Sequence, residues 1–267
     1  MTTHTRRPRV LFREDFAAGL HAGRWELRPT YAFAVGDGLV ARTAQGIAVT
    51  PSAVDPATGE PSFARPDGPE PPSAFLRWAA VARVTTAAGW PGFAAHASEP
   101  LAGSVDLAVN SYGTAATADP VADVRQGAGA LFAFDRETGL VFDFAVTANG
   151  VYAIYERLPM PGKQHRAFSC VVRLANVFPG ASHRCAIELD SAQGTVRWLF
   201  DGQPMLTVTR LGRQGFPDSC LLWAVPGEEE IAIPRQLAFG LCLLADAPHG
   251  QGVRLAASGF TVTGASE

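Results

Sequence analysis

The chain has 267 residues, of which 47% are hydrophobic and 18% are charged, and its formal net charge at pH 7 is −3. This composition is typical of a globular protein with a sizeable core, and a single large β-sandwich reaches this length. The weak acidic charge offers no basic surface for nucleic acid or for an anionic membrane.

The start of the chain, residues 1–9, carries three arginines and predicts a flexible N-terminal tail. No apolar run approaches the ~20 residues that a membrane span needs. The start also lacks the apolar stretch and small-residue cleavage site of a secretory signal. These features predict a cytoplasmic protein without a membrane partner.

The next elements in chain order are short strands. Apolar residues alternate with period two at residues 10–12, 142–146, 151–155 and 196–200, and turn sequences rich in Gly, Asn and Asp separate such runs. Helical periodicity is scarce. The pattern predicts an all-β protein, with residues 10–267 forming a single jelly-roll β-sandwich of two antiparallel sheets.

Residues 51–74 interrupt the alternation with seven prolines, which cannot donate hydrogen bonds to a sheet ladder. The 50 residues before this segment are too few for a good core of their own. The segment is therefore interpreted as a long loop that crosses the sandwich, and long loops in compact domains often line sites.

The hairpin at residues 141–159 holds the candidate catalytic groups. A two-residue turn at Asn149-Gly150 places Asp143 directly opposite Glu156, with Tyr152 on the same face. Like charges opposite one another are destabilising, so one carboxyl is expected to stay protonated with a raised pKa. In a cleft the pair serves acid–base catalysis; on a solvated face the two acids are merely screened or paired with arginine or lysine.

Five further residues are candidates for contacting a substrate. Trp78 and Trp90 offer aromatic surfaces, Trp90 from a loop, and Tyr112 is expected at the rim of the concave sheet. Arg157 ends the second strand of the hairpin, and His183 begins a later strand, where a structural role competes with proton transfer. The candidate substrate-binding set is therefore Trp78, Trp90, Tyr112, Arg157 and His183.

Four cysteines are widely spaced and are expected to be buried thiols rather than disulfide or zinc ligands. The histidines and acids show no metal-binding spacing, and no G-x-S-x-G, P-loop or dinucleotide fingerprint occurs. The sequence therefore predicts neither a metal nor a cofactor. It leaves the oligomeric state open.

Three segments resemble the concanavalin A-like lectin/glucanase sandwich: LFREDFAAGL through Trp25, GTVRWLFDGQPMLTV at 194–208, and residues 240–262. The runs VFDFAVTANGVYAIYERLP and GTVRWLFDG are similar, more closely, to those of a little-studied family of actinobacterial and fungal sandwich proteins. That family tends to carry histidines near the positions of Trp78, Thr114 and Trp223. Here those stretches are neutral or apolar, so any chemistry that depends on the histidines is lost or replaced.

The same superfamily includes laminarinase-like glycoside hydrolases with a Glu-x-Asp-x-x-Glu strand. The nearest match, Ile187-Glu188-Leu189-Asp190, lacks the third carboxylate and runs into a turn, which disfavours glycoside hydrolysis. The sequence favours an intracellular enzyme of secondary metabolism, such as a cyclase, isomerase or pericyclase-like catalyst, that binds a small, largely apolar molecule in the concave cleft. The alternative is a carbohydrate-binding, lectin-like module without catalysis.

Overall fold

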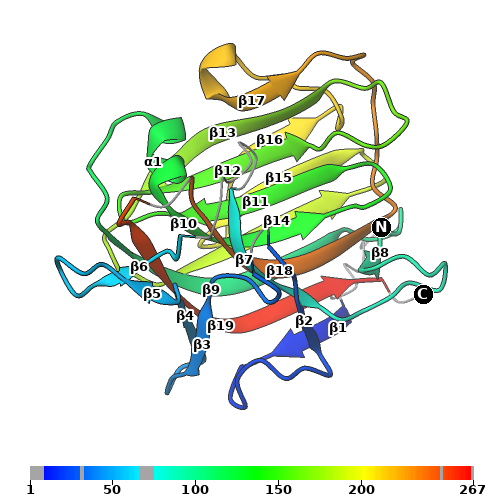
Figure 1. Ribbon diagram of the computed structural model, residues 1–267. Helices are drawn as coiled ribbons and strands as arrows, with labels where there is room; N and C mark the ends of the chain where they lie inside the picture. The colour runs from blue at the N-terminus through cyan, green and yellow to red at the C-terminus, as the bar shows by residue number, and fades with distance from the viewer. Residues whose placement is uncertain (1–8, 31–32, 66–74, 247–248, 266–267) are drawn as a thin grey trace.

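The computed structural model describes residues 9–30, 33–65, 75–246 and 249–265, and these form a sandwich of two large antiparallel sheets (Figure 1). This arrangement confirms the predicted all-β, jelly-roll architecture. The predicted N-terminal tail lies outside the described residues, apart from Arg9. No helix within the described ranges is long and apolar enough to cross a membrane.

The first sheet has eight strands. Its order is β16 (Gln203–Thr209), β15 (Thr195–Phe200), β14 (His183–Asp190), β9 (Leu101–Tyr112), β19 (Gly252–Gly264), β4 (Ile47–Thr50) and β3 (Leu39–Arg42), with β1 (Arg9–Glu14) also paired to β19.

The second sheet has nine strands. Its order is β17 (Leu221–Val225), β13 (Ala167–Asn176), β12 (Gly150–Arg157), β11 (Leu140–Val146), β10 (Ala128–Phe134), β18 (Gln236–Leu244), β7 (Leu76–Ala82) and β2 (Trp25–Leu27), with β8 (Phe93–Ala94) also paired to β18.

The two sheets bury one large apolar core between them, and alternation along the strands decides which residues enter it. In β9, Leu101, Val105 and Leu107 point inward and are buried, whereas the outward-facing Ala102, Ser104 and Asp106 are half-buried. In β11, Phe142 and Phe144 point inward. The inner faces of both sheets therefore have an ordinary sandwich core.

The outer faces of the two sheets differ. Strands β10, β11, β12 and β18 are buried on both sides along almost their whole length. A second apolar cluster covers the outer face of the nine-stranded sheet and includes Phe132, Tyr152, Ile154 and Cys242. A strand buried on both faces has a nearly continuous apolar sequence, as Leu140–Val146 has apart from Asp143.

One short helix, α1 (Pro120–Gln126), contributes Val124 to this second cluster. The Asp119 carboxylate accepts a hydrogen bond of 3.0 Å from the backbone N–H of Val121, and Pro120 follows it at the start of the helix, which is the usual N-terminal sequence of a helix. Figure 1 shows α1 at one end of the nine-stranded sheet, away from β8 and the chain termini. A 3₁₀ turn, η1 (Asp218–Cys220), precedes β17.

The predicted loop at 51–74 is partly regular. Within its described part, β5 (Ala53–Val54) and β6 (Pro61–Ser62) form a two-stranded hairpin. Its base is tied to the sandwich by the buried Asp37, whose carboxylate accepts hydrogen bonds from the backbone N–H groups of Ser52 (2.9 Å) and Ala64 (2.7 Å). The rest of the predicted loop, residues 66–74, lies outside the described residues.

Candidate functional site

The outer face of the nine-stranded sheet carries both predicted acids, and we call it the acid face. Asp143 in β11 lies between Phe132 of β10 and Ile154 of β12, and Glu156 in β12 lies between Val141 of β11 and Ser169 of β13. Because the side-chain period of a strand is two, Asp143 and Glu156 point to the same side. They are diagonal neighbours on adjacent strands.

The predicted register of this hairpin is wrong by two residues. The turn is at Ala148-Asn149, so Val146 pairs with Val151 and Asp143 pairs with Ile154 rather than with Glu156. Moving a two-residue turn by one position changes the cross-strand partner by two, which preserves the faces. The prediction that the acids share a face therefore survives, although their direct opposition does not.

The reason for the different turn lies outside the hairpin. The side chain of Asp123 in α1 accepts hydrogen bonds from the hydroxyl of Thr147 (2.6 Å) and from the amide of Asn149 (3.3 Å). Gly150 has no positive φ; instead, a Cβ atom there would lie 2.5 Å from the hydroxyl oxygen of Tyr152. Gly150 is thus required by the close approach of a side chain, not by a type I′ turn.

The two acids sit in an environment that disfavours charge. Asp143 is only 5% exposed, and within the described ranges no hydrogen-bond donor reaches its Oδ1 atom. Burial, and then the proximity of Glu156, raises the pKa of Asp143 well above its ordinary value. Burial raises the pKa of Glu156 to about 7, and the hydroxyl of the facing Ser169 partly opposes this shift.

No arginine or lysine in the described part of the chain forms an ion pair with either acid. The thiol of Cys242 lies on the same face, and burial together with the two nearby carboxyls raises its pKa well above the ordinary value. Such a thiol stays protonated at neutral pH. The chemistry available here is proton transfer by Glu156, beside Asp143, whose pKa is raised well above its ordinary value.

Tyr152, the third predicted catalytic residue, is occupied by a structural contact. Its hydroxyl donates a 2.6 Å hydrogen bond to the Asp123 carboxylate, and the ring is fully buried. Burial, and then this hydrogen bond to a carboxylate, raises the pKa of Tyr152. The guanidinium carbon of Arg173 lies 5.7 Å from the centre of the ring. Tyr152 therefore ties α1 to the acid face.

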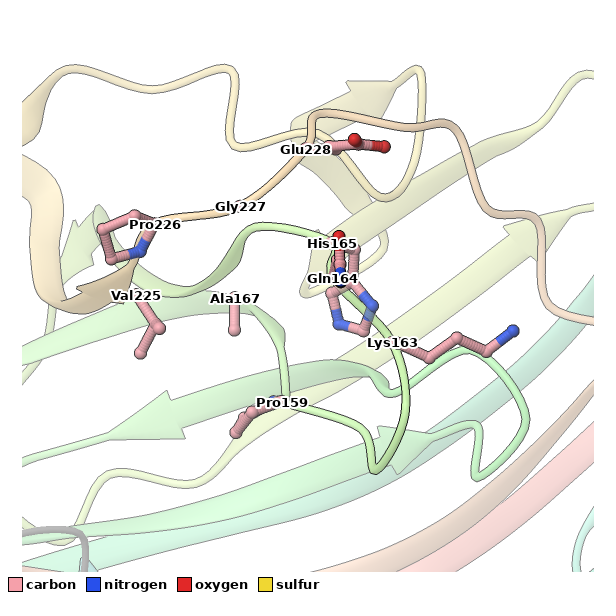
Figure 2. Close-up of a pocket in the computed structure, with 9 residues that line it drawn as sticks. All are labelled: Pro159, Lys163, Gln164, His165, Ala167, Val225, Pro226, Gly227 and Glu228. Atoms are coloured by element: carbon pink, nitrogen blue, oxygen red, sulfur yellow. The ribbon is translucent and has the colours of Figure 1, made fainter.

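A pocket of about 480 Å³ opens at the end of this face that is remote from α1. It lies between the loop after β12 and the segment after β17, as Figure 2 shows. Its lining residues are Pro159, Lys163, Gln164, His165, Ala167, Val225, Pro226, Gly227 and Glu228.

The pocket continues the row of residues that contains Glu156. Ser169 pairs with Glu156 on one side and with Trp223 on the other, and the next pair along β13 and β17 on the same face is Ala167 with Val225. Two residues along a strand span about 7 Å. Glu156 is half-buried, whereas Asp143 is almost fully covered. The pocket therefore lies at the end of the strand row that contains Glu156, and Glu156 is the acid nearer to it.

Three of the five predicted substrate contacts lie elsewhere. Trp78 is fully buried in the core between the sheets, because it alternates with outward-facing Ala79. His183 lies on the eight-stranded sheet, where Nδ1 is 2.9 Å from a carboxylate oxygen of Asp201. Tyr112 ends β9 of that same sheet. None of the three is brought to the acid face.

The other two have different positions. The buried Arg157 donates hydrogen bonds to the backbone carbonyls of Gly212 (3.0 Å) and Glu230 (3.1 Å) and pairs with the Glu230 carboxylate, so it fastens a loop. Trp90 lies in the predicted loop, half-buried, and its backbone bonds to Thr86. Trp90 therefore remains a candidate contact, though the structure does not bring it to the acid pair.

The glucanase-like acids also lie away from the acid face. Glu188 is in β14 of the eight-stranded sheet, on the outer side, and forms an ion pair with Arg197 of β15. The carboxylate of Asp190 accepts the backbone N–H of Gln193 in the following turn (3.0 Å). These contacts place the motif on the other sheet, and its exclusion as a catalytic strand stays a prediction.

Several residues of the site could not be recognised from the sequence. Cys242 and Ser169 are brought beside the acids only by sheet pairing, and the pocket joins two loops far apart in the chain. The Asp119-Pro120 sequence is typical of the start of a helix, and it was the one local indication that Asp123 lies in a helix. Nothing in the sequence showed where that helix would dock.

Comparisons with known proteins bear on the fold. A family model described as "Family of unknown function (DUF6081)" matches residues 11–266. No curated protein matches the chain.

Solved structures with similar folds include glucanases. The endo-1,3-β-glucanase of Streptomyces sioyaensis has a TM-score of 0.56 and 13% identity, over 97% of both chains. The endo-β-1,3-glucanase of Pyrococcus furiosus has a TM-score of 0.53 and 9% identity, over 97% of this chain and 96% of that one. Identities this low show a shared sandwich fold, as the resemblance to the lectin/glucanase superfamily predicted. The narrower resemblance around the YERLP run stays a prediction.

Proposed function

The chain belongs to the DUF6081 family of unknown function, and from that premise we propose that it is an enzyme that transfers a proton to or from a small, largely apolar molecule bound beside Glu156. The observation that carries the proposal is the pair of carboxyls on the acid face, neither of which has a cationic partner among the described residues. Strongly perturbed carboxyls beside a pocket are typical of functional sites.

The pKa of Glu156, about 7, suits general acid–base catalysis. A group that titrates near the working pH is present in both forms, so it can accept a proton in one step and return it in another. In its protonated form, which the raised pKa favours, Asp143 donates a hydrogen bond to Glu156 or to a developing negative charge. A proton taken from one position and returned at another gives a redox-neutral isomerisation or ring closure.

The surroundings favour an apolar substrate. The apolar part of the pocket lining is formed by Ala167, Val225 and the prolines 159 and 226, and the acid face beyond it carries mainly alanine, isoleucine, valine and phenylalanine. Reactive polyene or polyketide intermediates of secondary metabolism belong to this class. Their ring closure needs orientation and one proton donor more than many polar contacts.

A carbohydrate ligand is the second candidate, because similar folds occur in glucanases. It ranks lower for a chemical reason. A retaining or inverting glycosidase needs one ionised carboxylate beside the protonated acid. Here Asp143, the candidate for the protonated acid, is almost fully covered, and the glucanase-like Glu188 is paired with Arg197 on the other sheet.

Two measurements test the proposal. Carbon-13 NMR of the side-chain carboxyls should show Glu156 titrating near pH 7 and Asp143 protonated throughout neutral pH. In mass-spectrometric screens, neutral polyene and polyketide compounds should be isomerised or cyclised without a change of mass, and soluble β-glucans should be left intact.

Glu156→Gln should then lower turnover by roughly 10²–10⁴-fold, the usual contribution of a general acid or base. The matched variant Glu188→Gln, on the other sheet, should keep full turnover. Both carboxyls titrating at ordinary values, or glucan cleavage that survives Glu156→Gln, would refute the proposal.

A further inference from the structure

One row of paired residues crosses five strands of the nine-stranded sheet and has Glu156 at its centre. Its members, in the order of the strands from β10 to β17, are Phe134, Val141, Glu156, Ser169 and Trp223. Residues paired across a ladder point to the same side of the sheet, so all five lie on the acid face. We call them the Glu156 row, and Figure 1 shows its strands side by side.

The accessible side chains of the Glu156 row are its centre and its two ends. Phe134, Glu156 and Trp223 are half-buried. Between them, Val141 is 9% exposed and Ser169 is fully buried, and both side chains are short. Neighbouring strands lie about 4.8 Å apart, so each aromatic ring is roughly 10 Å from Glu156 and the two rings are roughly 20 Å from each other.

Phe134 is held in place by packing on its own sheet. The centre of its ring lies 6.0 Å from that of the buried Phe132, at an angle of 32°. The Phe132 ring lies over β18 at Gly240, where a Cβ atom would come within 2.6 Å of the ring. Glycine at position 240 therefore leaves the space that Phe132 occupies, and Phe132 supports Phe134.

Trp223 is held in place from another direction. It lies in β17, the outermost strand beside β13, and packs against the second apolar cluster. The guanidinium of Arg125 in α1 donates a 2.8 Å hydrogen bond to the backbone carbonyl of Leu222, the residue before Trp223. Because the backbone is fixed at both ends of the Glu156 row, little further ordering is needed when a ligand binds there.

We propose that Phe134 and Trp223 are specificity-determining residues that hold a long, flat, conjugated substrate across the strands, with its middle at Glu156. The proposal rests on the proposed function, because it takes Glu156 as the reacting group. Aromatic rings bind flat apolar groups by stacking or by edge-to-face contact. The Glu156 row contains one ionisable group, Glu156 itself, so an uncharged substrate suits both ends.

A conjugated substrate suits the geometry and the chemistry together. It is rigid, so contacts at its two ends place its middle without the cost of freezing many bond rotations. When Glu156 removes a proton, conjugation spreads the electron pair left behind along the chain. The same carboxyl then returns the proton at another carbon, so the composition of the molecule is unchanged.

Diphenyloctatetraene and trans-stilbene are matched probes, because both are flat, uncharged and end in phenyl rings, but only the longer one can contact both Phe134 and Trp223. Fluorescence titration with the protein measures the Kd of each. Phe134→Leu and Trp223→Leu should each weaken binding of diphenyloctatetraene by about 3–10-fold, the usual effect of one aromatic contact. Each variant should change stilbene binding by no more than about two-fold, because the other ring remains.

Trp223→Phe keeps an aromatic ring and should retain most of the affinity that Trp223→Leu loses. Phe178→Leu removes a ring that is 85% exposed in the loop after β13, and it is the matched control that should bind both probes as the wild type does. Glu156→Gln should keep the affinity as well, so failure of the catalytic proposal and failure of this one give different results. Binding of diphenyloctatetraene that is unchanged in either leucine variant overturns the proposal.

Discussion

The outer faces of the two sheets differ in whether their carboxyl groups have cationic partners. On the eight-stranded sheet, Glu188 pairs with Arg197, and Asp106 lies 3.2 Å from the guanidinium of Arg184. On the nine-stranded sheet, Asp143 and Glu156 have each other and no cation in the described part of the chain. Both faces belong to one sandwich, so the difference is not a consequence of the fold.

The comparison shows where the protein tolerates an unfavourable arrangement. Ion pairs on a half-exposed face change the free energy of folding only slightly. Unpaired carboxyls on a covered face destabilise the fold when they are ionised. Carboxyls with such perturbed pKa values are found mainly at functional sites. The acid face is therefore the one expected to respond strongly to substitution and to pH.

The largest effect on stability is expected from Asp123→Ala. It removes the buried carboxylate to which the hydroxyls of Tyr152 and Thr147 donate hydrogen bonds, at a cost of roughly 2–4 kcal/mol. The matched change on the other face, Asp106→Ala, should cost less than about 1 kcal/mol. Urea unfolding measures both, and equal costs would mean that the two faces do not differ in this way.

Ala145→Leu is expected to have the next largest effect. Ala145 lies fully buried on the acid face between Ala130 and Tyr152, so a larger side chain should cost about 1–3 kcal/mol by overpacking. Ala186→Leu on the half-buried outer face of β14 should stay within roughly 0.5 kcal/mol. Thermal unfolding compares the pair, and a tolerated Ala145→Leu would show that the acid face is loosely packed.

A gain in stability is expected from Glu156→Gln at alkaline pH. The pKa of Glu156 is raised from 4.5 to about 7, so between these values the folded state holds a proton that the unfolded state has released. Stability of the wild type should therefore fall as pH rises through this window. At pH 8 the variant should be more stable by roughly 1–3 kcal/mol. A wild-type stability that is flat from pH 5 to 8 would contradict the raised pKa.

The smallest effect is expected from Glu188→Gln. Loss of one ion pair with Arg197 on a half-exposed face should cost roughly 0–1 kcal/mol, and 1 M salt should reduce the difference from wild type. Urea unfolding at low and high salt measures it. A larger, salt-independent cost would place Glu188 in a functional or buried network and weaken the contrast between the faces.

The hairpin shows how far local sequence reasoning reaches. Alternation placed Asp143, Tyr152 and Glu156 on one face, and the structure agrees. The Asn149-Gly150 sequence predicted the turn one residue too late. The preference of this dipeptide for a type I′ turn is local, and the hydrogen bonds of Asp123 with Thr147 and Asn149 outweigh it. Those contacts come from a helix about 25 residues earlier in the chain, which no local pattern reveals.

The sequence by itself determined the fold class and the faces of the strands, because side-chain alternation and turn residues act over a few neighbouring positions. Only the tertiary structure decided which groups meet. It placed Trp78 inside the core, bonded Arg157 to the backbone of a loop, and left the acids without an ion pair to any described arginine or lysine. It also placed a pocket at the end of the face that carries Glu156. Pairing between distant strands and loops fixes these neighbours, and burial then sets their pKa values, so neither property can be read from residues in isolation.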